Sequence, residues 1–264
     1  VGNLEQAWSL LQESLPLSKE HGPPWQIALF TVILGNVAYE RGEYEHSYQL
    51  LCEALEHSRG VGDPRLLGFI SAYLGRTALK LKRTAEIEEV LWESAQLTRE
   101  SGDRFGYALI LEQLALAAMV RGDFTSAEQL FEASVDLFRE VGDVWNLSRT
   151  LTSWGEFRQS LGELTRAAEY FKQAIRLSLD VQALLITLNA LVGLARMYAQ
   201  GEKVRFALEI AIRVVEHPAS TQDARVSAHQ IRRDLESQLT NDEVEAAYQR
   251  ARADTLEEFA QVHL

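Results

Sequence analysis

The stretch from Arg139 to Ile175, REVGDVWNLSRTLTSWGEFRQSLGELTRAAEYFKQAI, holds two Gly-acid pairs that lie twenty residues apart. Glycine tolerates the left-handed backbone conformation that follows the end of a helix. Aspartate accepts hydrogen bonds from the unpaired amides of the next helix, and glutamate suits the positive end of its dipole. Each pair, Gly142-Asp143 and Gly162-Glu163, is therefore predicted to end one helix and to begin another.

The same helix breaks recur along the chain in two series, each with a period of forty residues, and the two series are offset from each other by twenty. Lys82-Arg83 stands where one pair of the second series is expected, and a later pair, Gly201-Glu202, comes one residue early. The spacing predicts antiparallel helices of roughly 16 to 18 residues joined by tight turns. The members of the two series are Gly62-Asp63, Gly102-Asp103, Gly142-Asp143, Gly42-Glu43, Gly122-Asp123 and Gly162-Glu163.

Small and large side chains also recur at fixed positions between the breaks. Small side chains let neighbouring helices approach, and a large side chain four residues later fills the gap beside them. Trp154 is expected in the core, and Trp92 is expected to pack in the core or between helices. The small positions are Ala7, Ser47, Ala127, Ala167 and Ala207, and the large positions are Leu11, Leu51, Leu91, Phe131 and Phe171.

Two segments carry a resemblance to a known family. LGNVAYERGEYEHSYQLLCEAL, from Leu34 to Leu55, resembles the tetratricopeptide repeat, and so does the segment from Leu151 to Ile175. The resemblance covers about residues 1–215, and it implies an all-α fold: a right-handed superhelical α-solenoid of antiparallel helix pairs. Usual repeats of this family are about 34 residues long, so the forty-residue period predicts helices nearly one turn longer.

The repeat predicts the domain organisation. We expect a solenoid over residues 1–217 and capping helices over residues 218–264. The solenoid opens with a segment that reads as the second helix of a pair, so a first helix is expected upstream of Val1. Its absence would leave an apolar flank that favours self-association. The expected parts are a half repeat at 1–21 and five helix pairs at about 23–60, 63–101, 103–141, 143–180 and 182–217.

The C-terminal segment admits two interpretations. Helix-start signals at Thr240-Asn241 and Asp254-Thr255 predict two short final helices. They would form the polar cap that solenoids need at their ends. The segment also resembles the C-terminal tails of bacterial multidomain ATPase regulators, through Tyr248 and Leu256-Glu257-Glu258, although a glycine common before the last helix of those tails is missing.

Composition excludes several classes of protein. The net charge of −12 disfavours direct nucleic-acid binding, because phosphate contacts need clustered Lys and Arg. No apolar run approaches the roughly 18 residues of a membrane span. The only cysteine, Cys52, rules out an internal disulfide and favours a reducing compartment, so the expected location is cytoplasmic.

Catalytic and metal-binding motifs are missing from the sequence. It contains no phosphate-binding loop, no dinucleotide fingerprint and no G-x-S-x-G elbow. The six histidines show no i, i+4 pair, so no metal is expected. The sequence therefore predicts neither an enzyme nor a cofactor.

Candidate binding residues follow from the resemblance, because in tetratricopeptide arrays the first helix of each pair lines the concave face. Arginine there suits carboxylate or phosphate, and aromatic residues and methionine suit apolar groups. A carboxylate clamp of the chaperone-adaptor type is disfavoured, since only Asn36 and Arg76 fit it. The residues at these positions are Asn36, Tyr39, Phe69, Arg76, Glu112, Leu116, Met119, Arg149, Thr152, Glu156, Asn189 and Arg196.

The resemblance implies a non-enzymatic binding module. The forty-residue period and the tail are similar to the sensor domains of bacterial signal-transducing ATPases with numerous domains. Such a sensor would bind an effector protein, peptide or small molecule in its groove and control an ATPase domain upstream in the same chain. The alternative is a constitutive scaffold that binds extended peptides, and an enzyme is the third hypothesis.

Overall fold

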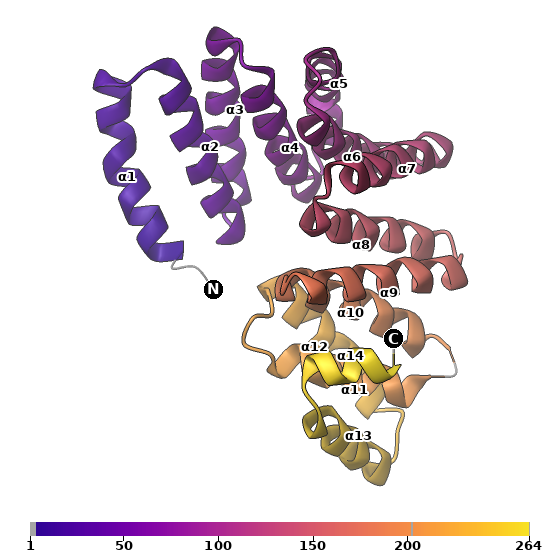
Figure 1. Cartoon of the computed structure of the whole chain (residues 1–264). Helices are drawn as coiled ribbons and strands as arrows, with labels where there is room; N and C mark the ends of the chain where they lie inside the picture. The colour runs from indigo at the N-terminus through magenta and orange to yellow at the C-terminus, as the bar shows by residue number, and fades with distance from the viewer. Residues whose placement is uncertain (1–3, 202, 264) are drawn as a thin grey trace. The chain divides into compact units, whose positions relative to one another are not determined.

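The computed structural model describes residues 4–201 and 203–263, and within these ranges all regular secondary structure is α-helical. Fourteen helices, α1 to α14, follow one another through short turns in this described part of the chain (Figure 1). The predicted all-α fold class is thereby confirmed. Glu202, part of the last predicted helix break, lies outside the described residues.

The chain forms two compact units, Val1–Val141 and Gly142–Leu264. The repeat pattern alone predicts one array over residues 1–217, whereas the structure divides that array between Val141 and Gly142. The pattern could not reveal this division, because the Gly-Asp turn at Gly142-Asp143 has the same local chemistry as the other turns of its series.

The first unit is a stack of antiparallel helix pairs. The first helices of successive pairs, α2, α4 and α6, lie side by side, and α3, α5 and α7 follow them as second helices (Figure 1). α4 packs against its neighbours α3, α5 and α6. The helices of this unit are α1 (Leu4–His21), α2 (Pro24–Glu40), α3 (Tyr44–Val61), α4 (Pro64–Lys80), α5 (Thr84–Glu100), α6 (Arg104–Arg121) and α7 (Phe124–Val141).

The second unit repeats the arrangement with α8, α10 and α12 as neighbouring first helices. Its end is built differently, because α13 packs against α11 and α14 contacts α9. The helices of this unit are α8 (Val144–Ser160), α9 (Leu164–Asp180), α10 (Leu184–Ala199), α11 (Val204–Glu216), α12 (Gln222–Glu236), α13 (Asn241–Ala253) and α14 (Leu256–His263).

The turns between helices have the geometry that the Gly-acid pairs predict. Six turn glycines adopt the left-handed conformation, with φ between 70° and 80°. Asp63, Asp103 and Asp143 each accept a hydrogen bond from a backbone amide in the first turn of the following helix. Each prediction of a helix stop and a helix start is confirmed at these turns. The six glycines are Gly42, Gly62, Gly102, Gly122, Gly142 and Gly162.

Two turns adopt the same conformation without glycine. Lys82 has φ of 59° and Gln182 has φ of 54°. A side chain in the left-handed region costs roughly 1–2 kcal/mol, because its Cβ crowds the following carbonyl. The repeat geometry therefore holds at Lys82 although the Gly-acid pair is missing, and it imposes strain there.

We expect Lys82→Gly and Gln182→Gly each to stabilise the protein by about 0.5–1 kcal/mol, since relief of the Cβ strain exceeds the extra chain entropy of glycine. The control is Gln173→Gly, an exposed position inside α9, which should destabilise by about 1 kcal/mol. Urea unfolding measures all three changes. Destabilisation by both turn substitutions would contradict the assignment of strain.

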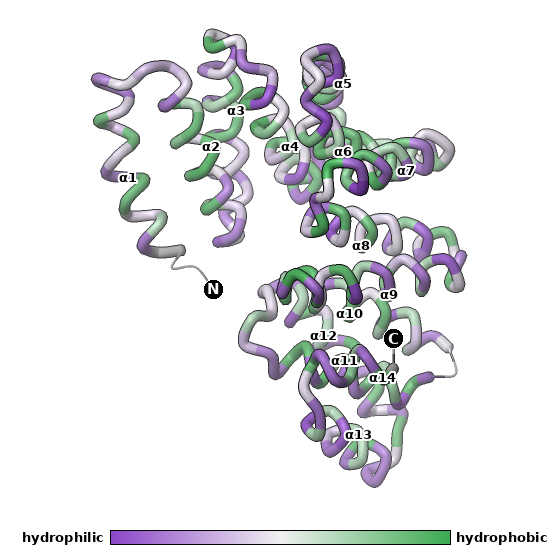
Figure 2. The backbone as a smooth tube through the Cα atoms, viewed as in Figure 1, coloured by the Kyte–Doolittle hydropathy of each residue, from purple (hydrophilic) through white to green (hydrophobic). Residues whose placement is uncertain are grey.

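The cores of both units use the predicted alternation of large and small residues. Phe131 and Phe171 are completely buried, and Trp154 is 6% exposed, which confirms its core assignment. Trp92, by contrast, is 50% exposed on α5, so it is not a core residue. Figure 2 shows the hydrophobic stretches along α2 and α10, two first helices that are covered by neighbours on several sides.

Candidate functional site

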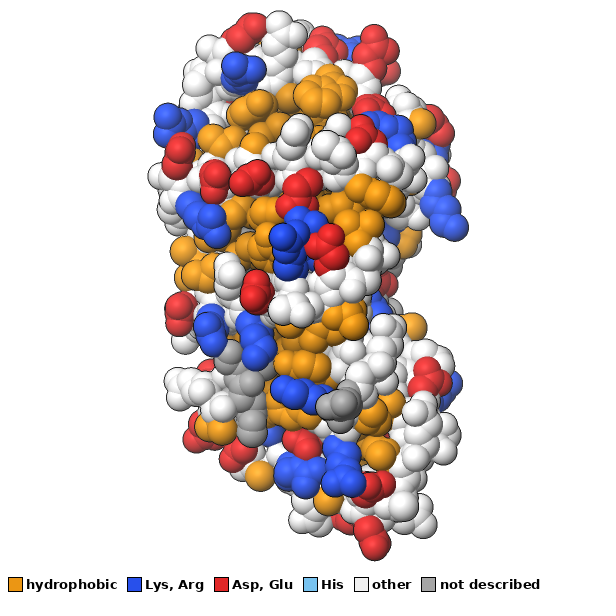
Figure 3. Space-filling view, turned by 90° about the vertical axis from the view of Figure 1, so that its right-hand side faces the viewer, with side chains coloured by type: hydrophobic (Ala, Val, Ile, Leu, Met, Phe, Trp, Pro, Cys, Tyr) orange, Lys and Arg blue, Asp and Glu red, His pale blue; other side chains and the backbone are white. Residues whose placement is uncertain are grey.

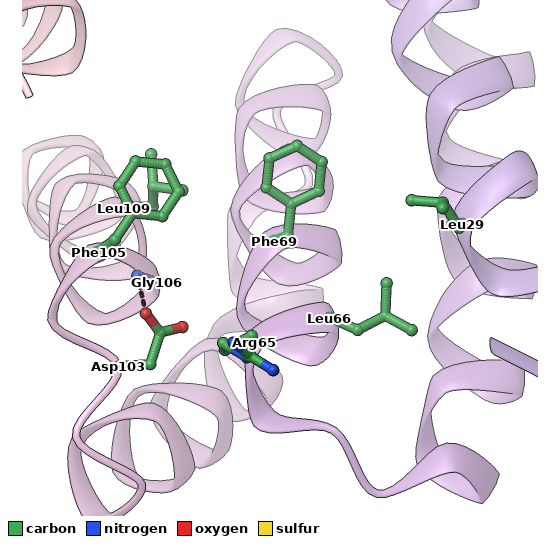
Figure 4. A pocket seen from close by; sticks show the side chains of 8 residues that line it. All are labelled: Leu29, Arg65, Leu66, Phe69, Asp103, Phe105, Gly106 and Leu109. Carbon is green, nitrogen blue, oxygen red and sulfur yellow. Dashed lines mark hydrogen bonds between the residues drawn. The ribbon is translucent and has the colours of Figure 1, made fainter. Parts of the chain in front are cut away.

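A hollow of about 280 Å³ opens on the first unit between α2, α4 and α6. Figure 4 shows Phe69 of α4 between two groups of side chains, with Leu29 and Leu66 on one side and Phe105 and Leu109 on the other. All five are apolar, so the lining suits an apolar group. Arg65, Asp103 and Gly106 complete the lining.

The turn before α6 shapes one side of this hollow. Asp103 caps α6 by accepting a hydrogen bond from the amide of Gly106 at 3.1 Å (Figure 4). A Cβ at residue 106 would lie 2.3 Å from Asp103 Oδ2, so any larger residue would displace the capping carboxylate. Glycine at this position therefore permits the cap, and it also leaves room for Thr98 of α5, whose Cγ2 would lie 3.3 Å from the added Cβ.

A second cluster lies further along α2 and α4 and centres on Arg76. Its guanidinium lies 4.0 Å from the centre of the Tyr39 ring and 5.0 Å from that of Tyr73. Arg76 Nη2 donates to Asn36 Oδ1 at 2.5 Å and lies 3.5 Å from Glu40 Oε1. Burial raises the pKa of Tyr39, so its hydroxyl is neutral at physiological pH. The arginine is thus held between two aromatic rings by α2 and α4.

The hollow and the arginine cluster are continuous along α4. The rings of Phe69 and Tyr73 meet edge to face with their centroids 4.7 Å apart, and Tyr73 in turn contacts Arg76. Residues spaced three or four apart share one face of a helix. Leu66, Phe69, Tyr73 and Arg76 therefore form one strip, apolar at one end and cationic at the other.

The structure brings together four of the predicted site residues: Asn36, Tyr39, Phe69 and Arg76. The α6 positions behave differently. Glu112 is only 1% exposed, because α6 packs against α4, α5 and α7. Leu116 and Met119 are half-buried on the same helix. Glu112 is therefore not placed to reach a ligand on the surface of this unit.

The predicted residues of the second unit differ in their exposure and partners. Arg149 donates to Asn146 Oδ1 at 3.1 Å, and Thr152 is buried with its hydroxyl bonded to the Ser148 carbonyl. Glu156 is exposed, and Asn189 and Arg196 are half-buried. Thr152 differs from the expectation of an accessible side chain, since the threonine satisfies its hydroxyl within its own helix.

Four apolar residues of the hollow, Leu29, Leu66, Phe105 and Leu109, are missing from the prediction, as are Arg65, Asp103 and Gly106. The sequence did hold a signal for two of them: Leu29 and Leu109 lie forty residues on either side of Phe69, in the same register of the repeat. Phe105 shares its register with the aromatic residues Trp25 and Trp145, whereas Leu66 had no such signal.

The rest of the described surface offers little that points to catalysis. Acidic and basic side chains are interspersed on the face in Figure 3, with apolar side chains exposed between them. Among the described residues, no three His, Cys, Asp or Glu side chains are grouped so that they could hold a metal ion. None of the described helices is long and apolar enough to span a membrane.

Stacked antiparallel helix pairs with a hollow on the first helices define a helical repeat module, a class that recognises partners on extended surfaces. Residues 106–180 match the family model of the tetratricopeptide repeat, which confirms the resemblance for that segment. Residues 106–180 thus match this family, and the described helices of the whole chain share the fold of helical repeat arrays. A comparison with curated proteins found no match.

Solved structures share the fold at low sequence identity. BtubC (BKLC) from P. vanneervenii aligns with a TM-score of 0.58 at 16% identity, over 91% of this chain and 95% of BtubC. A signal transduction ATPase with numerous domains from Pyrococcus horikoshii, which carries a tetratricopeptide repeat sensor, aligns with a TM-score of 0.60 at 14% sequence identity. This alignment covers 99% of this chain and 41% of that protein. The apo form of the quorum sensor NprR from B. thuringiensis aligns with a TM-score of 0.60 at 14% sequence identity, over 98% of this chain and 78% of NprR.

Proposed function

We propose that the chain is a non-enzymatic binding module whose first unit receives an apolar group of its partner in the hollow between α2, α4 and α6. The observation that carries the proposal is the apolar lining of that hollow by three successive first helices. Exposed apolar surface costs free energy in water, so a folded protein that keeps such a hollow gains when a partner covers it.

The size of the hollow favours one side chain of a protein or peptide partner over a whole small molecule. Pockets for small molecules typically enclose about 300–1,000 Å³ and cover most of the ligand. The hollow, at about 280 Å³, falls just below this range and is open to the surface. A single bulky apolar side chain fills such a space, with the remainder of the partner lying along the helices.

The proposed setting of this module is the sensor segment of a larger signal-transducing ATPase. Two of the similar structures support this setting: the ATPase from P. horikoshii has a tetratricopeptide repeat sensor, and NprR is a quorum sensor. Effector binding would act by its different affinities for two conformations of the array. A phosphate-binding loop encoded upstream of Val1 is the expected finding in the full-length gene.

Selection from a displayed random-peptide library tests the binding proposal. We expect the peptides enriched on the wild-type protein to carry a bulky apolar residue and to bind Phe69→Ala about tenfold more weakly, as expected for loss of a buried aromatic contact. Trp92→Ala is the matched control, because this exposed aromatic residue of α5 does not line the hollow. Equal binding to wild type and Phe69→Ala would contradict the proposal.

A constitutive scaffold is the second candidate. The match to BtubC extends over 95% of that chain, so this fold also occurs as nearly a whole chain without an ATPase domain, which is what a scaffold requires. The two candidates differ in the full-length gene, since a scaffold requires no ATPase domain. Both use the same hollow, so the peptide selection is informative for either.

A further inference from the structure

We propose that the outward face of α11 is a docking surface for a short amphipathic helix of another protein, and that α14 occupies this surface in the unbound chain. We call the face of α11 that carries Phe206 and Arg213 the acceptor face. It belongs to a second helix of the second unit, so the inference goes beyond the proposed function and does not depend on the hollow of the first unit.

The sequence of α11 departs from the repeat at this face. Phe206 and Arg213 stand forty residues after Arg166 and Gln173 of α9, at the same positions of the repeat. Arg166 and Gln173 are exposed, as the outward face of a second helix at the surface of an array requires. By contrast, all residues from 207 to 214 of α11 are buried. The outward face of α11 is therefore built to be covered, whereas that of α9 is built for water.

One face of α14 covers the acceptor face. Leu256, Phe259 and Ala260 have the spacing i, i+3 and i+4 that places them together, and they are 8%, 1% and 6% exposed. In Figure 1, α14 lies in front of α11, and the Phe259 ring stacks on that of Phe206 with the centroids 5.3 Å apart. The Arg213 guanidinium lies 4.4 Å from the centre of the Phe259 ring. A partner helix with a leucine, an aromatic and a small residue at this spacing matches the same face.

The attachment of α14 is of a kind that a partner can replace. α14 has eight residues, and a helix of this length is marginal in water by itself. Arg213 donates its hydrogen bonds to the carbonyls of Arg250 and Asp254, which precede α14, so these bonds hold the end of α13 when α14 leaves. Thr255 and Glu258 cap the start of α14 through bonds within the segment itself. The apolar side chains of one face attach α14 to α11, and another helix can supply the same side chains.

The tether makes α14 a strong competitor for its own acceptor face. A segment joined by a short linker acts at an effective concentration on the order of 1 mM. A partner helix therefore binds weakly while α14 is in place and more tightly once α14 is displaced. Binding of the partner would release α14, which couples occupation of the acceptor face to the C-terminal end of the chain.

The test uses a fluorescein-labelled peptide with the sequence of residues 254–263, and fluorescence polarisation measures its binding to the 264-residue chain. Phe259→Ala weakens the attachment of α14 and leaves α11 unchanged. We expect the peptide to bind this variant about tenfold more tightly than the wild-type chain. Ala260→Asp is a second variant that opens the acceptor face, because a carboxylate is costly to bury against apolar side chains. It keeps the test decisive if Phe259→Ala does not fold, which circular dichroism shows.

Two controls assign the binding to the acceptor face. Phe206→Ala in the Phe259→Ala background should abolish the tenfold gain, because the aromatic partner of the peptide is removed. A peptide with alanine in place of Leu256 and Phe259 should not bind. Phe69→Ala, in the hollow of the first unit, should leave binding of the peptide unchanged, so a failure of this inference is distinct from a failure of the proposed function.

Three outcomes would overturn the proposal. The first is equal binding, or no binding, of the peptide to the wild-type chain and to both opening variants. The second is a gain in binding that survives Phe206→Ala. The third is a dimer of the wild-type chain in sedimentation that Phe259→Ala dissociates, because the acceptor face would then take α14 of a second copy and not a helix of another protein.

Discussion

Replacement of Gly193 by alanine is expected to destabilise the second unit by about 3 kcal/mol. A Cβ on residue 193 would lie 2.4 Å from Cε1 and 2.5 Å from Cζ of Phe171, far inside van der Waals contact. The Phe171 ring cannot move away, because it is completely buried and a Cβ built on Gly155 of α8 would lie only 2.8 Å from its Cε1. Overpacking of a well-packed core costs roughly 1–3 kcal/mol. We expect the upper end of this range here, because the Phe171 ring is confined on two sides.

Gly60→Ala is the control, and it should raise the free energy of unfolding instead of lowering it. Gly60 lies inside α3, and a Cβ there meets no atom within 4 Å. Alanine stabilises an open helical site by about 1 kcal/mol relative to glycine. Urea unfolding followed by circular dichroism measures both changes.

A double substitution identifies the cause of the Gly193 effect. Phe171→Leu alone leaves a small cavity, but in the Gly193→Ala background it provides room for the new methyl group. The two changes together should therefore cost less than the sum of the single costs. Strict additivity would show that the ring of Phe171 is not the obstacle.

Replacement of Arg213 by methionine is the second large expected effect, about 3 kcal/mol. Arg213 is 9% exposed and donates from Nη1 to the Asp254 carbonyl and from Nη2 to the Arg250 carbonyl, each at 2.7 Å. Its guanidinium also lies 4.4 Å from the centre of the Phe259 ring. Methionine fills a similar space but leaves two carbonyls at the end of α13 without their donor, which is costly at a buried site.

The loss of stability in Arg213→Met should be confined to the end of the second unit. Arg213 is the residue of α11 that joins the last turn of α13 to α14, so we expect amide hydrogen exchange to accelerate in α13 and α14 first. Burial lowers the pKa of Arg213, yet an arginine remains charged at any physiological pH. The destabilisation by Arg213→Met should therefore not change with pH between about 6 and 8.

Arg252→Met is the matched control for this prediction. Arg252 of α13 pairs with Glu216 of α11 through two nitrogens, at 3.1 and 2.5 Å, but its side chain is 61% exposed. Exposed ion pairs contribute about 1 kcal/mol or less. If the two methionine variants destabilised the protein equally, burial would not be what makes Arg213 important.

The site was only partly accessible from sequence. The repeat register placed Phe69 and Arg76 on first helices, and the structure joins them through Tyr73, which the register did not select. The repeat register also selected Glu112 and Thr152, which are buried in the structure. Exposure depends on which helices cover a position, and a repeat register does not contain that information.

The sequence by itself determined the helices and their breaks, because a helix ends where glycine adopts a left-handed conformation and begins where aspartate caps an amide. These are interactions among a few neighbouring residues, and the amino-acid sequence shows that they recur every forty residues. Tertiary packing decided the rest, namely the division between Val141 and Gly142 and the hollow beside Phe69. Each of these depends on contacts between residues far apart in the chain, for which local chemistry provides no signal.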